Sequence, residues 1–291
     1  MSFKIIVLAK QVPDTRNVGK DAMKADGTVN RAALPAIFNP EDLNALEMAI
    51  EIKKSLNVET EIVLLTMGPP RAAEIIRESI YRGADYGILL TDRKFAGSDT
   101  LATSYAISMA IRKLAPYDLV IAGRQAIDGD TAQVGPQVAE KLNIPQITYA
   151  EDVVSVDAKS IVIKRRLERG VETVKAPFPA LITVHSSATP CRERNAKRMM
   201  KYKHSRTLTE LQTEVNDYSV LFVDRPYLLI KEWSVEDIQA DVEMLGLSGS
   251  PTKVKKIENV VLTQKDSKKI QSNDIEIDEL MKELISTHII G

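Results

Sequence analysis

The chain has 291 residues, 44% of them hydrophobic and 27% charged, which is enough apolar material for one large α/β core with appendages or for two domains. The formal net charge of −1 argues against a nucleic-acid partner, and the single cysteine, Cys191, excludes an internal disulfide and favours a reducing compartment. The apolar runs are far too short to span a bilayer and a strand begins almost at once, so we expect a cytoplasmic protein with no signal peptide and no membrane insertion.

Four short apolar runs recur in the first half of the chain, at 4–9, 61–67, 87–91 and 118–122. They are apolar on consecutive residues, which is typical of strands covered on both faces and therefore of a parallel sheet. Helical patterns separate them: one starts at Asn39-Pro40, where Asn39 supplies a cap, and others cover 72–81, 99–114 and 134–142. This alternation predicts a doubly wound, mostly parallel α/β fold.

The pattern changes in the second half of the chain. Residues 159–175 predict a β-hairpin that turns at Arg169-Gly170, and 179–185 predict another buried strand. A last amphipathic helix is expected at 278–287. We expect an α/β domain over 1–205 and, over 206–291, a C-terminal arm that packs on a partner, because the later segment has little core of its own.

The stretch "AGRQAIDGDTAQVGP", residues 122–136, follows a buried strand with polar groups and glycines. Parallel sheets bind ligands at the carboxyl ends of their strands, and each expected strand here runs into a small polar loop. Gly123 ends a strand where a side chain would block a flat ring, Gly129 and Thr131 lie where main-chain amides could face a phosphate, and Arg124 could neutralise its charge. The alternative is a plain turn followed by a helix cap, and the residues alone leave both open. Neither a Gly-x-Gly-x-x-Gly motif nor a P-loop is present.

Other candidate residues give weaker signals. Cys191 has basic neighbours that favour a thiolate, but no base is placed beside it, so a surface thiol is the simpler interpretation. The basic, Met-bearing run at 190–203 is either a docking surface or a solvated loop. We assign no catalytic side chain and no metal site.

Several motifs together resemble one family. "KQVPDT", "NPEDLNALEMA", "TMGPP", "SDTLATS", "GRQAIDGDTAQVGP" and "GLSGSPTKV", with the hairpin "IKRRLERGVETVKAPFPALIT", are similar to the beta subunit of electron-transfer flavoproteins, in the family's order and over nearly the whole chain. The resemblance implies a heterodimer with an alpha subunit that carries its own flavin. It also implies an adenine nucleotide held between the strand-end loops, which is AMP in simple electron carriers and a second FAD in electron-bifurcating members.

Carried over position by position, the resemblance implies a set of cofactor-binding residues at the strand ends. They are Leu8, Ala9, Lys10, Asn39, Pro40, Met67, Gly68, Asp99, Thr100, Thr103, Gly123, Arg124, Gln125, Ala126, Ile127, Asp128, Gly129, Asp130, Thr131, Ala132, Gln133 and Val134. The region 190–203 aligns with the loop that meets a flavin dehydrogenase, although its sequence departs from the versions expected there.

The resemblance favours FAD, with AMP as the alternative, because "DGDTAQVG" is similar to the anaerobic bacterial subgroup and Gly129 leaves room for a diphosphate. FAD implies oxidation of NADH, with electrons parting between ferredoxin and an acyl-CoA-type or other flavin dehydrogenase; AMP implies a carrier without catalysis of its own. From another class, a universal-stress-type nucleotide sensor shares the strand-loop architecture but has no need of the arm after residue 205.

Overall fold

The computed structural model describes residues 2–14, 34–214, 219–252, 269–287 and 289–290. The chain divides into two compact units, Met1–Lys255 and Lys256–Gly291. Each unit is described by itself.

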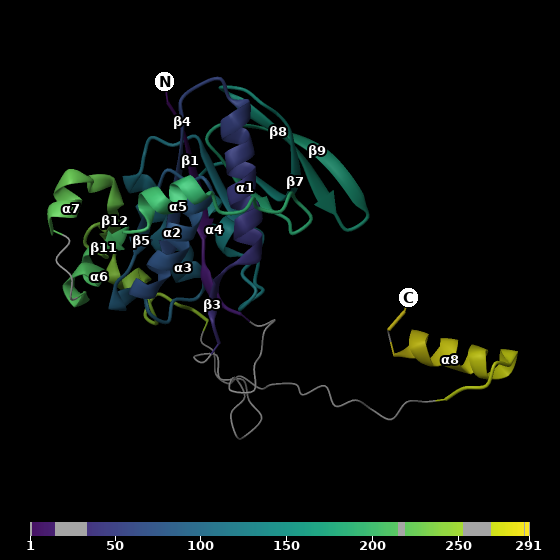
Figure 1. Cartoon of the computed structure of the whole chain (residues 1–291). Helices are drawn as coiled ribbons and strands as arrows, with labels where there is room; N and C mark the ends of the chain where they lie inside the picture. The colour runs from purple at the N-terminus through teal and green to yellow at the C-terminus, as the bar shows by residue number, and fades with distance from the viewer. Residues whose placement is uncertain (1, 15–33, 215–218, 253–268, 288, 291) are drawn as a thin grey trace. The chain divides into compact units, whose positions relative to one another are not determined.

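A ten-stranded sheet forms the first unit, with strand order β11-β12-β5-β4-β1-β6-β10-β7-β8-β9 (Figure 1). From β11 through β7 every neighbouring pair is parallel. The central strands are β1 (Phe3–Ala9), β4 (Thr60–Met67), β5 (Tyr86–Leu90), β6 (Leu119–Gly123) and β10 (Ala180–Val184). All four strands predicted in the first half are confirmed to within one residue at each end, and so is the doubly wound, mostly parallel fold.

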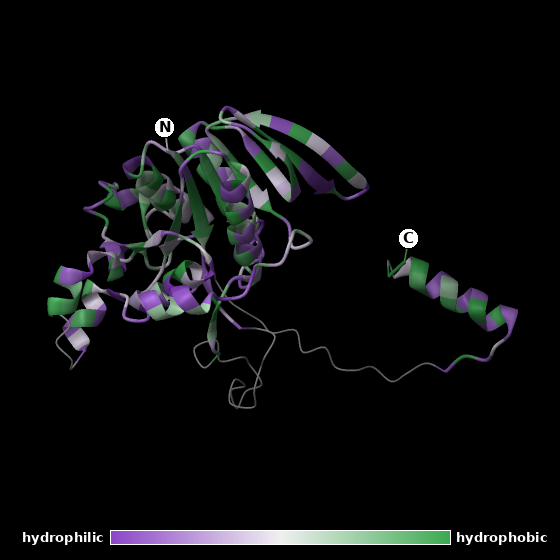
Figure 2. Cartoon of the chain, turned by 45° about the horizontal axis from the view of Figure 1, so that its top comes forward, coloured by the Kyte–Doolittle hydropathy of each residue, from purple (hydrophilic) through white to green (hydrophobic). Residues whose placement is uncertain are grey.

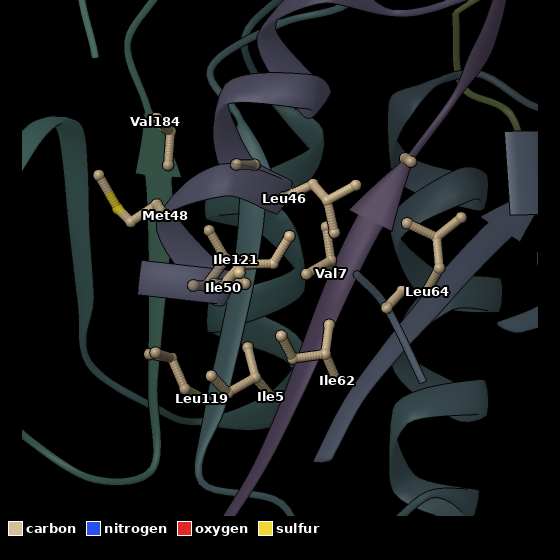
Figure 3. Close-up of a cluster of buried hydrophobic side chains, with 14 of the residues drawn as sticks. Ile5, Val7, Leu46, Met48, Ile50, Ile62, Leu64, Leu119, Ile121 and Val184 are labelled. Carbon is tan, nitrogen blue, oxygen red and sulfur yellow. The ribbon is translucent and has the colours of Figure 1, made fainter. Parts of the chain in front are cut away.

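Four helices cover the two faces of this sheet. Helices α1 (Pro40–Ser55) and α2 (Ala73–Arg82) pack on one face, and α3 (Thr100–Lys113) and α4 (Val134–Leu142) pack on the other. Successive residues of β1 point to opposite faces, so Ile5 and Val7 join the core under α1 while Ile6 and Leu8 join the core under α3 (Figure 3). Burial on both faces explains why these strands are apolar at every position.

The strand order reverses beside β1. The chain passes from β1 outward to β4 and β5, then returns to place β6 on the other side of β1. The carboxyl ends of β1 and β6 therefore flank the switch point, which is where open α/β sheets bind ligands.

An antiparallel extension continues the sheet past β10. It consists of β7 (Gln146–Val156), β8 (Ser160–Leu167) and β9 (Gly170–Pro177), and hydrophobic and hydrophilic residues are interspersed along it (Figure 2). Leu167 pairs with Gly170, so the predicted hairpin is confirmed with its turn one residue earlier, at Glu168 and Arg169.

The compact unit continues past residue 205, where the sequence placed the start of an arm. Strand β12 (Leu229–Trp233) pairs with β5, and β11 (Arg206–Thr207) pairs with β12. The remaining elements of this unit are β2 (Gln11–Pro13), β3 (Ala36–Phe38), α5 (Ala196–Tyr202), α6 (Leu208–Thr213), α7 (Ser219–Asp224) and the 3-10 helices η3 (Pro70–Ala72), η4 (Arg93–Phe95), η5 (Pro226–Leu228) and η6 (Val242–Met244).

The described part of the second unit contains α8 (Asp274–Ser286), which begins four residues before the predicted start. Leu280, Met281, Leu284 and Ile285 recur at the three- and four-residue spacing expected for an amphipathic helix, and Figure 2 shows hydrophobic and hydrophilic residues interspersed along it. Across both units, none of the described helices has the length and apolar character needed to cross a membrane.

Candidate functional site

The first turn of α1 lies against the loop that follows β6. Asn39 occupies the cap position of α1, as predicted, but its side chain makes no capping hydrogen bond. Its Nδ2 instead donates to the carbonyl of Gln125 at 2.9 Å, and its Oδ1 accepts from the amide of Ile127 at 3.1 Å. Asn39 therefore fixes the course of the loop rather than the start of the helix.

Glu41 makes a second link between α1 and this loop. Its side chain is only 8% exposed and pairs with the Arg124 guanidinium at 2.8 Å. The same carboxylate accepts from the amide of Gln125 at 3.1 Å. The charge of Arg124 is thus opposed by a buried carboxylate, which weakens the role in neutralising phosphate that the sequence suggested for Arg124.

Asp42 makes the third link, and it joins two strands. One carboxylate oxygen accepts from the amide of Lys10, just past β1, at 2.8 Å, and the other accepts from the amide of Gly123, at the end of β6, at 3.1 Å. Burial raises the pKa of Asp42 to about 7, although hydrogen bonds from Asn39, Lys10 and Gly123 oppose the rise.

This close approach supplies a reason for glycine at 123 that the sequence did not. A Cβ at this position would lie 2.7 Å from the carbonyl carbon of Glu41 and 2.8 Å from the amide nitrogen of Asp42. Both are main-chain atoms of α1, so neither can rotate away. Helix α1 requires this glycine whether or not a flat ring lies beside it.

Further along the same loop, the main chain at Gly129 borders open space. A Cβ at Gly129 would meet nothing within 4 Å. Asp130 and Ala132 have left-handed backbones, with φ of 49° and 51°, and Gln133 returns to the right-handed region. Such alternation turns successive N–H groups to one side and costs about 1 kcal/mol for each non-glycine residue.

Within the described part of the chain, the amides of Thr131 and Ala132 donate to no protein acceptor. They lead directly into the N-terminal end of α4, which carries unpaired amides and a partial positive charge. Together these groups form a set of main-chain donors suited to an anion.

Two contacts tie this loop to its neighbours. The ammonium group of Lys10 pairs with Asp128 at 2.7 Å, and the Thr100 hydroxyl donates to the Gln133 side chain at 2.8 Å. The loops after β1 and β6 and the start of α3 thus lie in contact. Met67 and Gly68 lie at the end of the neighbouring strand β4, but no hydrogen bond between described residues joins them to the loop after β6.

Asp99 has structural partners. Its carboxylate caps α3 by accepting from the amides of Leu101 and Ala102 at 2.9 and 3.0 Å, and it also accepts from the Thr252 amide and hydroxyl. Slight burial favours a higher pKa, but these hydrogen bonds, led by that from Thr252, hold the pKa of Asp99 below its usual value. Thr103 donates its amide to the carbonyl of Asp99, within the first turn of the same helix.

Comparison with known proteins agrees with this architecture. A family model described as the electron transfer flavoprotein domain matches residues 26–206. An electron transfer flavoprotein subunit beta of Clostridium acetobutylicum is 44% identical over 254 residues, which cover 87% of each chain. One from Megasphaera elsdenii is 40% identical over 301 residues, covering 99% of this chain and 100% of its own.

The chain belongs to the electron transfer flavoprotein beta-subunit family. A further member, the caffeyl-CoA reductase-Etf complex subunit CarD of Acetobacterium woodii, is 42% identical over 252 residues, covering 87% of this chain and 86% of its own. The family gives the chain a role in electron transfer as one subunit of a complex. Membership of this family rules out the alternative that the residues alone left open, a nucleotide sensor of the universal-stress type.

Sequence reasoning missed two residues of the candidate site in this electron transfer flavoprotein subunit, Glu41 and Asp42. Acidic residues in a first helical turn have a local explanation in the helix dipole, and that explanation hid their contacts with the loop. The signal that could have revealed them is excess: "NPED" places three polar side chains where one cap is enough.

A hollow of about 510 Å³ also escaped sequence analysis. It is lined by Tyr149, Arg165, Arg166, Leu167, Glu168 and His185, from β7, β8, the hairpin turn and the end of β10. Burial, and then the nearby charge of Arg124, lowers the pKa of His185. In the part of the chain that the structure describes, no three His, Cys, Asp or Glu residues gather in a way that could hold a metal ion.

The region 190–203 is fixed to the core at one end and exposed at the other. The amide of Arg192 donates to the buried Glu47 of α1 at 2.9 Å, and the two side chains form an ion pair. Farther on, α5 exposes 66% of Met200. Burial raises the pKa of Cys191 to about 11 despite its basic neighbours, so a thiolate is not favoured.

Proposed function

We propose that this beta subunit binds FAD at the switch point, with the diphosphate against the donors at 131–134 and α4. The observation that carries the proposal is the pair of amides at Thr131 and Ala132, which donate to no protein acceptor among the described residues and lie in a loop with two left-handed residues. A left-handed backbone costs free energy at a residue other than glycine, and such strain clusters at ligand-binding sites, which supports a ligand at this loop.

FAD fits the open side of the loop better than AMP does. Gly129 has no neighbour on its Cβ side, and its absent side chain leaves room for a second phosphate. Lys10 lies at the rim with its charge shared with Asp128, and Arg124 is shared with Glu41, so the site has cations without a large excess of positive charge. AMP remains the second candidate, because the same donors suit one phosphate.

We further propose a heterodimer with an electron transfer flavoprotein alpha subunit, in the cytoplasm. The name of the Acetobacterium woodii relative places that protein in a complex with a CoA-ester reductase, which supports an acyl-CoA-type dehydrogenase as the partner at 190–203. FAD would supply hydride acceptance from NADH and one-electron transfer, to ferredoxin on one side and to the alpha flavin on the other. The protein's part is to orient the ring and tune its potential.

Counting the nucleotides in the purified heterodimer tests this proposal. The complex is denatured, and the released nucleotides are separated and quantified by chromatography against standards. We expect two FAD per heterodimer and no AMP, together with bleaching of both flavins by NADH under anaerobic conditions. One FAD and one AMP would favour the simple carrier, and a single FAD with no second nucleotide would refute a nucleotide site in this subunit.

A further inference from the structure

The parallel ladder between β1 and β6 ends before the strands reach the site. Its last pair is Leu8 with Ala122. Beyond it the two chains part: the Arg124 amide donates to Val184 of β10, and the Lys10 carbonyl accepts from the amide of Asn39. The carboxylate of Asp42 spans this gap, with one oxygen on the amide of Lys10 and the other on the amide of Gly123.

We propose that Asp42 is a positioning residue for the nucleotide. The Asp42 carboxylate sets the separation of the two chain segments that form the walls of the site. This inference rests on the proposed function. Each of the two amides is bound by a different oxygen of Asp42, and an amide side chain in the same place would turn its NH₂ group, a donor, toward one of them. Losing either bond frees one wall, and the loop donors near Thr131 lie on the segment that begins at Gly123.

A second aspartate links the same two strands at their other end. There, Asp118 accepts from the amide of Lys4 at 2.8 Å, while its own amide donates to the carbonyl of Lys4 at 3.0 Å. This carboxylate also ties β1 to β6, but it lies at the amino ends of the strands, away from the switch point. Asp118→Asn is therefore a control for the general cost of loosening this strand pair.

The protonation of Asp42 provides a second measurement that needs no variant. A protonated carboxyl replaces one acceptor by a donor, and the pKa of about 7 places this change near neutral pH. The charged and titratable groups around it are Glu41 on the same turn, Lys10 with its partner Asp128, Arg124 paired with Glu41, and His185 after β10. The FAD diphosphate itself does not titrate in this range.

The experiment measures FAD and AMP dissociation constants calorimetrically in the full-length heterodimer, stripped of nucleotide, for wild type, Asp42→Asn and Asp118→Asn. We expect Asp42→Asn to raise both dissociation constants about tenfold, which is about 1.4 kcal/mol of binding free energy, and Asp118→Asn to leave them unchanged. Urea unfolding should show that the two variants lose comparable amounts of unfolding free energy. Wild-type affinity for FAD should fall as the pH drops from about 8 to about 6, and that of Asp42→Asn should not.

Equal affinities of wild type and Asp42→Asn, or an equal loss in Asp118→Asn, would overturn the role of Asp42. If Asp42→Asn does not fold, a wild-type FAD affinity that is independent of pH would overturn it instead. Wild type that binds neither FAD nor AMP would refute the proposed function itself.

Discussion

Replacing Gly123 by alanine tests whether α1 and the end of β6 are as tightly packed as the structure shows. The new Cβ would lie 2.7 and 2.8 Å from two main-chain atoms of α1 and closer still to an Asp42 oxygen. Forcing extra volume into a packed region costs about 1 to 3 kcal/mol. Loss of the hydrogen bond from the Gly123 amide to Asp42 adds about 1 kcal/mol. We therefore expect Gly123→Ala to lower the free energy of unfolding by about 2 to 4 kcal/mol.

Urea unfolding of the purified heterodimer, followed by circular dichroism, measures this loss. Gly129→Ala is the matched control, because it makes the same substitution six residues later in the same loop, where a Cβ meets nothing within 4 Å and φ is not left-handed. The control should unfold within about 0.5 kcal/mol of wild type. If Gly123→Ala is as stable as Gly129→Ala, then α1 can withdraw from β6 at little cost, and the reasoning from close approach is wrong.

Three further predictions concern charged residues of the site. Removing the cation in Arg124→Ala should lower the reduction potential of the FAD proposed to bind here by about 30 mV, whereas Glu41→Gln, which frees that cation, should raise it. Spectroelectrochemical titrations in which both variants shift the potential in the same direction would contradict this. Because the pKa of Asp42 rises from about 3.9 unfolded to about 7 folded, wild-type stability relative to Asp42→Asn should decline as the pH rises from about 4 to about 7 and then level off. Urea unfolding at several pH values measures this, and a flat difference over that range would refute it. Asp99→Ala should lower the free energy of unfolding by about 1 kcal/mol through the lost α3 cap and speed proteolysis near Thr252, while nucleotide affinity stays unchanged. A weaker nucleotide affinity in this variant would contradict the structural role of Asp99.

The sequence predicted the elements whose signals are local. Helix α4 was predicted with its observed bounds because Asn143, with φ of 55°, and Pro145 mark its end within three residues. Strand β7 was missed because its buried positions follow neither the consecutive nor the alternating pattern. Strand β12 was missed because Lys231 and Glu232 give an outer strand a polar sequence.

The candidate site divides in the same way. The loop at 123–134 was predicted because its glycines and polar residues directly follow a buried strand. The links from α1 could not be predicted, because the amides that Asp42 binds are 32 and 81 residues away in sequence. Contacts with main-chain groups leave no trace in the identity of the residue contacted, so no pattern within the loop points to them.

The pairing of β12 with β5 has a consequence for how the protein is made. Ile88, Leu89 and Leu90 of β5 are almost fully buried, and Leu229–Trp233 protects the free edge of that strand. Until that segment has been synthesised, the apolar strand β5 has an unpaired edge on which other unfolded chains can add. A protein truncated before Leu229 would keep this unpaired edge, so β12 protects the chain against aggregation as well as completing the sheet.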